Sequence, residues 1–345
     1  MIINGITLGV QNCPYLIAEL SANHGGNINN AFEAIRLAKE SGASAVKIQS
    51  YTPDTMTLNS NKPDFLIRGG LWDGYTLYDL YKEAYTPFEW HEDLFKFAKE
   101  IDITIFSSPF DESAVDLLEN LNAPAYKIAS FELVDLDLIS YVARTGKPIL
   151  MSTGMASDSE IEEAVLTAKD NGCTSLLLFH CVSSYPAKIE DCNLRRLKYL
   201  SERYGANIGL SDHTTNNIAS SIAIGLGAVA IEKHFTPNHA IKSADSAFSL
   251  DPKEFKEFST CAKSSWLALG TTSDKKSVDE IKNRIFRRSI YFVKDLNSGE
   301  TITSKHIKRI RPGAGLEPKY YREILGKSVV KDVEAGDPVT LDLIK

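Results

Sequence analysis

The chain has 345 residues, 43% of them hydrophobic and 24% charged, which is typical of a globular protein with room for about two domains. It contains no apolar run of the roughly 18 residues that a membrane helix needs, and its start lacks the layout of a signal peptide, so we expect a cytoplasmic protein. The net charge of −7 argues against a general nucleic-acid-binding protein, and the five cysteines, which include no C-x-x-C pair, favour reduced thiols.

Residues 1–265 repeat one unit, in which a short apolar run ends in polar residues and is followed by a loop and a stretch with helical periodicity. Strands that are apolar throughout and alternate with helices form parallel sheets, so eight such units predict an α/β fold, a closed (β/α)8 TIM barrel. A doubly wound open sheet is the alternative, but no G-x-G-x-x-G motif follows the first run. The predicted strands are 15–20, 45–50, 104–109, 125–130, 148–153, 176–181, 207–213 and 230–235, and the predicted helices include 29–41, 88–100, 111–121, 158–171, 190–203 and 216–226.

Polar residues end these predicted strands, at the edge where barrels of this kind build their active sites. Lys47 and Lys127 stand inside otherwise apolar runs, where an unpaired ammonium group would be costly to bury. Serines and backbone N–H groups nearby could act as directional donors, so we predict one shared anion site. The strand-end residues are Glu19, Lys47, Gln49, Ser107, Ser108, Lys127, Ser130, Ser152, His180, Ser211, His213, Glu232 and His234.

Two of these residues, His213 and His234, end the seventh and eighth predicted strands, which are neighbours in a barrel. Two neutral imidazoles that converge could hold a divalent metal with positions left open for a substrate. Alternatively, one or both form hydrogen bonds only within their loops. His24, in the sequence S-A-N-H-G-G, is a third candidate ligand and could equally cap its loop.

The segment from Thr52 to Thr86 is too long for a simple connection between a strand and a helix, and it is rich in aromatic residues. It is expected to be a lid, a substrate-selecting element or a contact with another subunit.

Residues 266–284 have the polar composition of a linker, and residues 285–345 contain short strand-like runs separated by turns. We predict a small β-rich domain there, which would have a thin core on its own and is expected to dock on a barrel. This segment holds 12 Lys and Arg against 8 Asp and Glu, a net of +4, which leaves −11 for the rest of the chain. The uneven charge favours electrostatic docking of the tail on a neighbouring barrel.

A series of short motifs runs along the chain in the order IAELSANHGG, VKIQ, FSSPFD, YKIAS, STGM, HCVSSYP, GLSDHT, EKHFT and RPGAG. In order and spacing these motifs resemble those of the sialic acid synthase family. The resemblance covers nearly the whole chain, and the tail is similar to that family's antifreeze-like (SAF, β-clip) domain. The loop LWDGYTLYDLYKEAYTPFEWH resembles the branch of the family that makes pseudaminic acid.

The resemblance implies a transferase that condenses phosphoenolpyruvate with an open-chain acetamido sugar and releases phosphate by C–O cleavage. In the pseudaminic branch the sugar is 2,4-diacetamido-2,4,6-trideoxy-L-altrose. N-acetylneuraminate and N,N′-diacetyllegionaminate synthases are alternatives with the same chemistry. A phosphosugar aldolase with Lys127 as a Schiff-base nucleophile and a carbohydrate- or ice-binding module on an inert barrel are alternatives of other classes.

The resemblance also assigns roles to residues. His213 and His234 match metal ligands, with manganese expected first and magnesium or cobalt as alternatives. Arg311 is expected to reach the partner's barrel in a domain-swapped homodimer. The chain departs from the family in one respect, because the substrate-contacting asparagine of the long second loop has no clear counterpart near Trp72 and Asp73. The remaining matches are the phosphoenolpyruvate-binding Lys47, Ser108, Lys127, Ser130, Ser152 and Ser211, the catalytic Glu19, Gln49 and Asp245, and the sugar-binding Glu132, Tyr185, Asp245 and Arg311.

Overall fold

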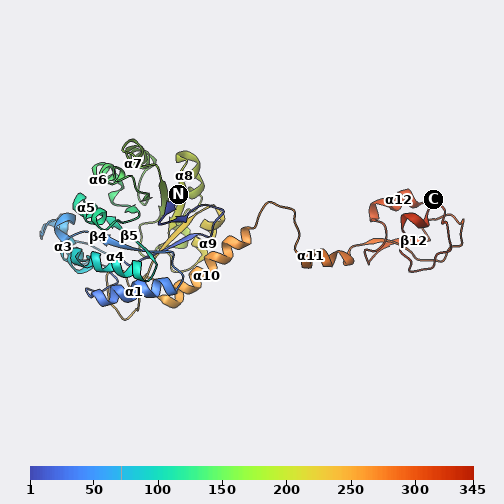
Figure 1. Ribbon diagram of the computed structural model, residues 1–345, viewed down its shortest axis with the longest axis horizontal. Coiled ribbons are helices and arrows are strands. Elements are labelled where there is room, and N and C mark those ends of the chain that lie inside the picture. Colours follow the sequence, from blue (N-terminus) through green and yellow to red (C-terminus); the bar gives the residue numbers. More distant parts are fainter. Residues whose placement is uncertain (71) are drawn as a thin grey trace. The chain divides into compact units, whose positions relative to one another are not determined.

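Eight parallel strands close into a barrel in the computed structural model, which describes residues 1–70 and 72–345 (Figure 1). Each strand pairs with the next one along the chain, and the last closes on the first, with His234 in register with Glu19. The predicted (β/α)8 barrel is confirmed, with each strand inside its predicted range. The barrel strands are β3 (Tyr15–Glu19), β4 (Ala45–Ser50), β5 (Thr104–Pro109), β6 (Tyr126–Ile128), β7 (Ile149–Ser152), β8 (Leu176–Cys181), β9 (Asn207–Ser211) and β10 (Ala230–His234).

Helices surround the barrel (Figure 1), and most begin at a polar cap. The helix that follows β7 begins with a capping box, in which Ser157 and Glu160 exchange hydrogen bonds. Helix α8 begins at Arg196 rather than near residue 190, because Asn193 adopts a left-handed backbone with φ 41°. The helices of this unit are α1 (Ile28–Glu40), α2 (Pro53–Met56), α3 (Leu77–Ala84), α4 (His91–Glu100), α5 (Glu112–Asn120), α6 (Leu136–Ala143), α7 (Asp158–Asp170), α8 (Arg196–Tyr204), α9 (Ile218–Gly225) and α10 (Pro252–Leu269).

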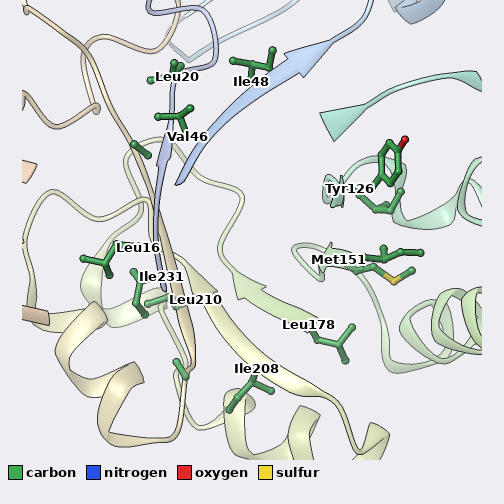
Figure 2. Packing of buried hydrophobic residues seen from close by; sticks show 14 of the residues in the cluster. Leu16, Leu20, Val46, Ile48, Tyr126, Met151, Leu178, Ile208, Leu210 and Ile231 are labelled. Carbon is green, nitrogen blue, oxygen red and sulfur yellow. The ribbon is translucent and has the colours of Figure 1, made fainter. Parts of the chain in front are cut away.

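The alternation of side chains along each strand divides the apolar residues into two cores. Outward-facing residues such as Leu16, Val46 and Ile231 pack under the helices (Figure 2). Inward-facing residues such as Ile17 and Phe106 fill the barrel, together with Ile3 and Leu8 from the hairpin of β1 (Ile2–Ile3) and β2 (Ile6–Thr7). Toward the C-terminal ends of the strands, the inward-facing residues are polar instead of apolar. The predicted site therefore lies above the apolar core.

One buried ion pair lies on the outward face of β10. Lys233 contacts Asp212 at 3.0 Å and donates to the Thr214 carbonyl at 2.7 Å. Asp212 also accepts hydrogen bonds from the Thr214 hydroxyl and from Ser220 on α9. Because both charges are fully buried and paired, this network ties the ends of β9 and β10 to the helix layer.

Residues Thr271–Lys345 form a second compact unit, separate from Met1–Gly270. Its antiparallel strands β11 (Ser289–Phe292) and β12 (Ile307–Ile310) pack over a small apolar core that includes Ile290 and Val339. A side chain at Gly315 would approach the Ile290 carbonyl to 2.3 Å, so this close contact requires glycine. The helices α11 (Val278–Lys282) and α12 (Tyr321–Ile324) are short. Among the described residues, no helix is long and apolar enough to cross a membrane.

Candidate active site

Four buried charged side chains meet inside the barrel near the C-terminal ends of its strands. Lys47 Nζ lies 2.6 Å from a Glu19 oxygen and 3.8 Å from Glu232. Lys127 Nζ donates to both oxygens of Glu232 at 2.9 and 3.0 Å, and it lies 4.4 Å from the ring centroid of Phe179 below it. Both predicted lysines therefore converge as expected, and each is matched by a carboxylate.

Burial and pairing act against each other in this cluster. Burial alone would raise the pKa of Glu232, but Lys127 and Lys47 outweigh it and lower that pKa to about 2. Burial raises the pKa of Glu19, and the charge of Glu232 adds to the effect, while Lys47 opposes it. Burial also lowers the pKa of Lys127. Glu232 is thus the firmly ionised carboxylate, and Glu19 is the one closer to taking up a proton.

Glu232 was among the strand-end residues, but it was not predicted as part of the site. The signal was available in the sequence, because two buried lysines require a counter-charge and Glu232 shares the inward face of β10 with His234. Its carboxylate also accepts a hydrogen bond from Ser211 at 3.0 Å. Glu232 is therefore bonded to groups that were predicted to donate hydrogen bonds to a bound anion.

A second group of small polar side chains surrounds Gly154, in the loop after β7. A Cβ atom at this position would lie 2.3 Å from Ser183 Oγ, 2.7 Å from Cys181 Sγ and 2.8 Å from Ser130 Oγ. Ser130 was predicted to bind phosphoenolpyruvate, whereas Ser183 and Cys181 were not assigned to the site. These three groups pack so closely on the backbone that only glycine fits here, and their hydroxyl and thiol groups are possible hydrogen-bond donors for an anion.

The two predicted metal ligands lie side by side, with ring centroids 5.4 Å apart. His213 donates from Nδ1 to the Val182 carbonyl at 2.8 Å, which leaves Nε2 unprotonated, 3.4 Å from Ser211 Oγ. His234 Nδ1 is buried and has no hydrogen-bond partner among the described residues, and it lies 3.7 Å from an oxygen of Asp245. Burial lowers the pKa of His213 to about 4 and that of His234 to about 3, so both rings are neutral. Two imidazoles and a carboxylate are ligand types that suit a divalent metal, although the ligand atoms of His213, His234 and Asp245 do not all lie within 4.8 Å of one another.

The loop that carries Asp245 is fixed by a buried asparagine that the sequence analysis did not single out. Asn23 donates to the Phe235 carbonyl and to Ser249 Oγ, both at 2.8 Å, and accepts from Ser243 at 2.6 Å. Ser249 in turn donates to the Asp245 carbonyl at 2.7 Å. The loops after β3 and β10 are therefore held together beside the histidines.

The other predicted residues lie around this centre. Gln49 donates to Glu19 at 2.9 Å, and Lys47 donates to Ser108 at 3.4 Å. Ser152 is buried at the end of β7. Glu132 begins a 3₁₀ turn after β6, where burial raises its pKa to about 7.

Tyr185 stacks on His213 with centroids 4.3 Å apart. Arg311 belongs to the C-terminal unit, directly after β12, and its side chain is exposed.

Three polar residues from the sequence analysis take structural roles instead. Ser107 and His180 occupy outward positions, where Ser107 donates to the Ile48 carbonyl and His180 Nε2 lies 2.7 Å from the Cys192 carbonyl. His24 accepts a hydrogen bond from the Gly26 N–H at Nδ1, which supports its interpretation as a loop cap.

Among the described residues, a surface group of three possible metal ligands does have its ligand atoms close together. His239, Asp251 and Glu254 have ligand atoms within 4.8 Å of one another. Asp251 and Glu254 form the capping box of α10, which explains their proximity without a metal.

Comparison with known proteins agrees with this geometry. The NeuB family matches residues 34–274 and the SAF domain matches residues 287–345. The pseudaminic acid synthase of Helicobacter pylori is 47% identical over 96% of this chain and 98% of its own length, and that of Campylobacter jejuni is 45% identical over 94% of each. The N-acetylneuraminic acid synthetase structure from Leptospira borgpetersenii has a TM-score of 0.73 and 30% identity over 82% of this chain and 94% of its own. The predicted family and the SAF tail are thereby confirmed, and the chain belongs to the NeuB family.

Proposed function

We propose that this protein is a cytoplasmic pseudaminic acid synthase. It would condense phosphoenolpyruvate with 2,4-diacetamido-2,4,6-trideoxy-L-altrose and water, and release pseudaminic acid and phosphate. The observation that carries the proposal is the pair of buried lysines beside two neutral histidines at one end of the barrel. The sequence identities favour this product over legionaminic acid. The chain is 47% identical to the pseudaminic acid synthase of Helicobacter pylori but 33% identical to a diacetyllegionaminic acid synthase from Legionella pneumophila.

In this proposal phosphoenolpyruvate binds between Lys47 and Lys127. Ser108, Ser130, Ser152 and Ser211 would supply hydroxyl donors, and Ser183, which packs beside Ser130 against Gly154, would join them. Glu232 already accepts hydrogen bonds from Lys127 and Ser211, so the substrate has to compete with this carboxylate for the same donors. Binding of phosphoenolpyruvate therefore depends on the positive charges of the two lysines, because two neutral donors would not outweigh the repulsion between Glu232 and the anionic substrate.

His213 and His234 would hold the divalent metal, with Asp245 as the neighbouring carboxylate. A bound divalent ion would polarise the sugar aldehyde and increase its electrophilicity. Manganese is the proposed ion, with magnesium or cobalt as alternatives. Asn23 contributes indirectly, because it fixes the loop that carries Asp245.

The remaining polar groups would guide the bond changes. The lysines hold phosphoenolpyruvate so that its C3 reaches the aldehyde carbon and forms the new C–C bond. Glu19, oriented by Gln49, would stabilise the positive character that develops at C2. Glu19 or Asp245 would then accept a proton from the water that adds at C2, and phosphate leaves with the bridging oxygen. Glu132 and Tyr185 would contact the sugar.

We also propose that residues 1–265 carry out catalysis and that residues 266–284 link them to the SAF domain of residues 285–345. In a domain-swapped homodimer, Arg311 would complete the partner's sugar site. The net charge of +4 on residues 285–345 against −11 on the rest supports docking of the tail on an acidic partner.

Phosphate release tests the proposed activity directly. The full-length protein is incubated with phosphoenolpyruvate, a panel of acetamido sugars, and either manganese or a chelator. We expect release only with metal and fastest with the 2,4-diacetamido-2,4,6-trideoxy sugar. A preference for N-acetylmannosamine would move the protein to the N-acetylneuraminate branch, and release without any sugar or metal would contradict the proposed chemistry.

A further inference from the structure

An aromatic wall, formed by Tyr185, Phe248 and Trp72, extends from the two histidines of the site. The ring centroid of Phe248 lies 4.9 Å from that of His234 and 5.1 Å from that of Tyr185, which itself stacks on His213. Trp72 joins the wall through Tyr185, with a centroid distance of 6.3 Å. The wall therefore begins at the histidines and continues through Tyr185 to the long loop after β4.

Trp72 is anchored in a way that leaves its ring surface apolar. Its indole Nε1 donates to the Ala244 carbonyl at 3.2 Å, next to Asp245 in the loop after β10. An indole has only this one polar group, so the rest of the half-buried ring offers carbon atoms alone. The hydrogen bond also fixes the ring against the loop of Asp245, which gives the wall a defined position.

The wall lies where the far end of an open-chain sugar would extend. The proposed function places the sugar aldehyde, C1, at His213 and His234. In an open hexose C6 is the carbon farthest from C1, so it lies away from the histidines, and the wall is an apolar surface that leads away from them. A methyl group at C6 would pack on aromatic carbon there, whereas a hydroxyl group would lose its hydrogen bonds to water and gain none from the wall.

We propose that Trp72 determines the sugar specificity of this enzyme by forming the apolar contact for the deoxygenated C6 end of the substrate. The inference rests on the proposed function, since it takes the aldehyde to lie at the two histidines. It assigns to Trp72 a selective role, distinct from the hydrogen bond by which the same side chain anchors its loop.

The test compares kcat/KM for the 6-deoxy sugar with kcat/KM for its analogue that carries a hydroxyl at C6. Apolar pockets commonly discriminate against one added hydroxyl by up to about 10²-fold, so Trp72→Ala is expected to lower the preference for the 6-deoxy sugar by about tenfold or more. Trp72→Phe keeps an aromatic surface but loses the hydrogen bond to Ala244, and it should retain most of the preference.

Trp266→Ala is the matched control. Trp266 on α10 also donates from Nε1 to a backbone carbonyl, that of Val10, at 3.2 Å, and lies outside the loops of the site. This variant should keep the wild-type preference.

Two results would overturn the inference. If Trp72→Ala and Trp72→Phe lower turnover of both sugars equally, Trp72 acts only as a loop anchor. If Trp72→Ala keeps full activity and the same preference, the wall does not contact C6. Failure of the proposed function has a different signature, because the wild-type protein would then not prefer the 6-deoxy sugar at all.

Discussion

Replacing Lys127 with methionine is expected to lower kcat/KM for phosphoenolpyruvate by about 10²- to 10³-fold. Truncating one partner of a buried charged contact between two binding partners costs about 2–5 kcal/mol, and each 1.4 kcal/mol corresponds to about a factor of ten. The loss should be large because Glu232, which Lys127 holds at 2.9 and 3.0 Å, would then repel the incoming substrate. Steady-state kinetics with phosphoenolpyruvate as the varied substrate measure the effect.

Lys233→Met is the matched control for this variant. Lys233 is also fully buried and paired with an acid, but it faces the helices rather than the barrel interior. Its loss should destabilise the barrel by about 3–5 kcal/mol, seen as a lower melting temperature, and leave the KM for phosphoenolpyruvate unchanged in the folded protein. If both variants raise that KM equally, Lys127 acts through stability alone and the anion site is wrong.

A mixed dimer is expected to recover activity that neither parent variant has. Arg311→Ala should lower kcat/KM for the sugar by about 10²-fold, as for removal of one partner from a buried charged contact. In a heterodimer of Lys127→Met and Arg311→Ala subunits, a domain swap produces one complete site out of two. The purified heterodimer, isolated with two different tags after co-expression, should have about half the wild-type activity.

The control for this experiment is each homodimer purified in the same way, which should stay inactive or nearly so. If the heterodimer is as inactive as its parents, Arg311 acts within its own chain or not at all. A fully active monomer in sedimentation experiments would also contradict the swap.

The barrel could be predicted from the sequence because its strands have a simple signature. Each is an apolar run of defined length that ends in polar residues, and helices follow at regular intervals. The helix α6 (Leu136–Ala143) has a weaker sequence signal, because five of its residues are buried and it lacks the polar stripe of a surface helix. The last helix, α10, runs to Leu269 and so extends into the predicted linker.

The site could be predicted from the sequence where the alternation of side chains along a strand determines which residues face the barrel interior. Lys47 and Lys127 both face inward, whereas Ser107 and His180 were strand-end residues that the same alternation turns outward. Contacts between distant loops could not be derived in this way. Asn23 meets Ser243 and Ser249, and Trp72 meets Ala244, across long separations in sequence that no local pattern encodes.

The most direct test of the central chemical claim uses phosphoenolpyruvate with oxygen-18 in the bond between C2 and phosphate. The full-length protein converts it with the 2,4-diacetamido-2,4,6-trideoxy sugar and manganese, and mass spectrometry locates the label. C–O cleavage predicts that the label leaves with inorganic phosphate and that the sugar acid takes its oxygen from water. Retention of the label in the sugar acid would show P–O cleavage and contradict the account.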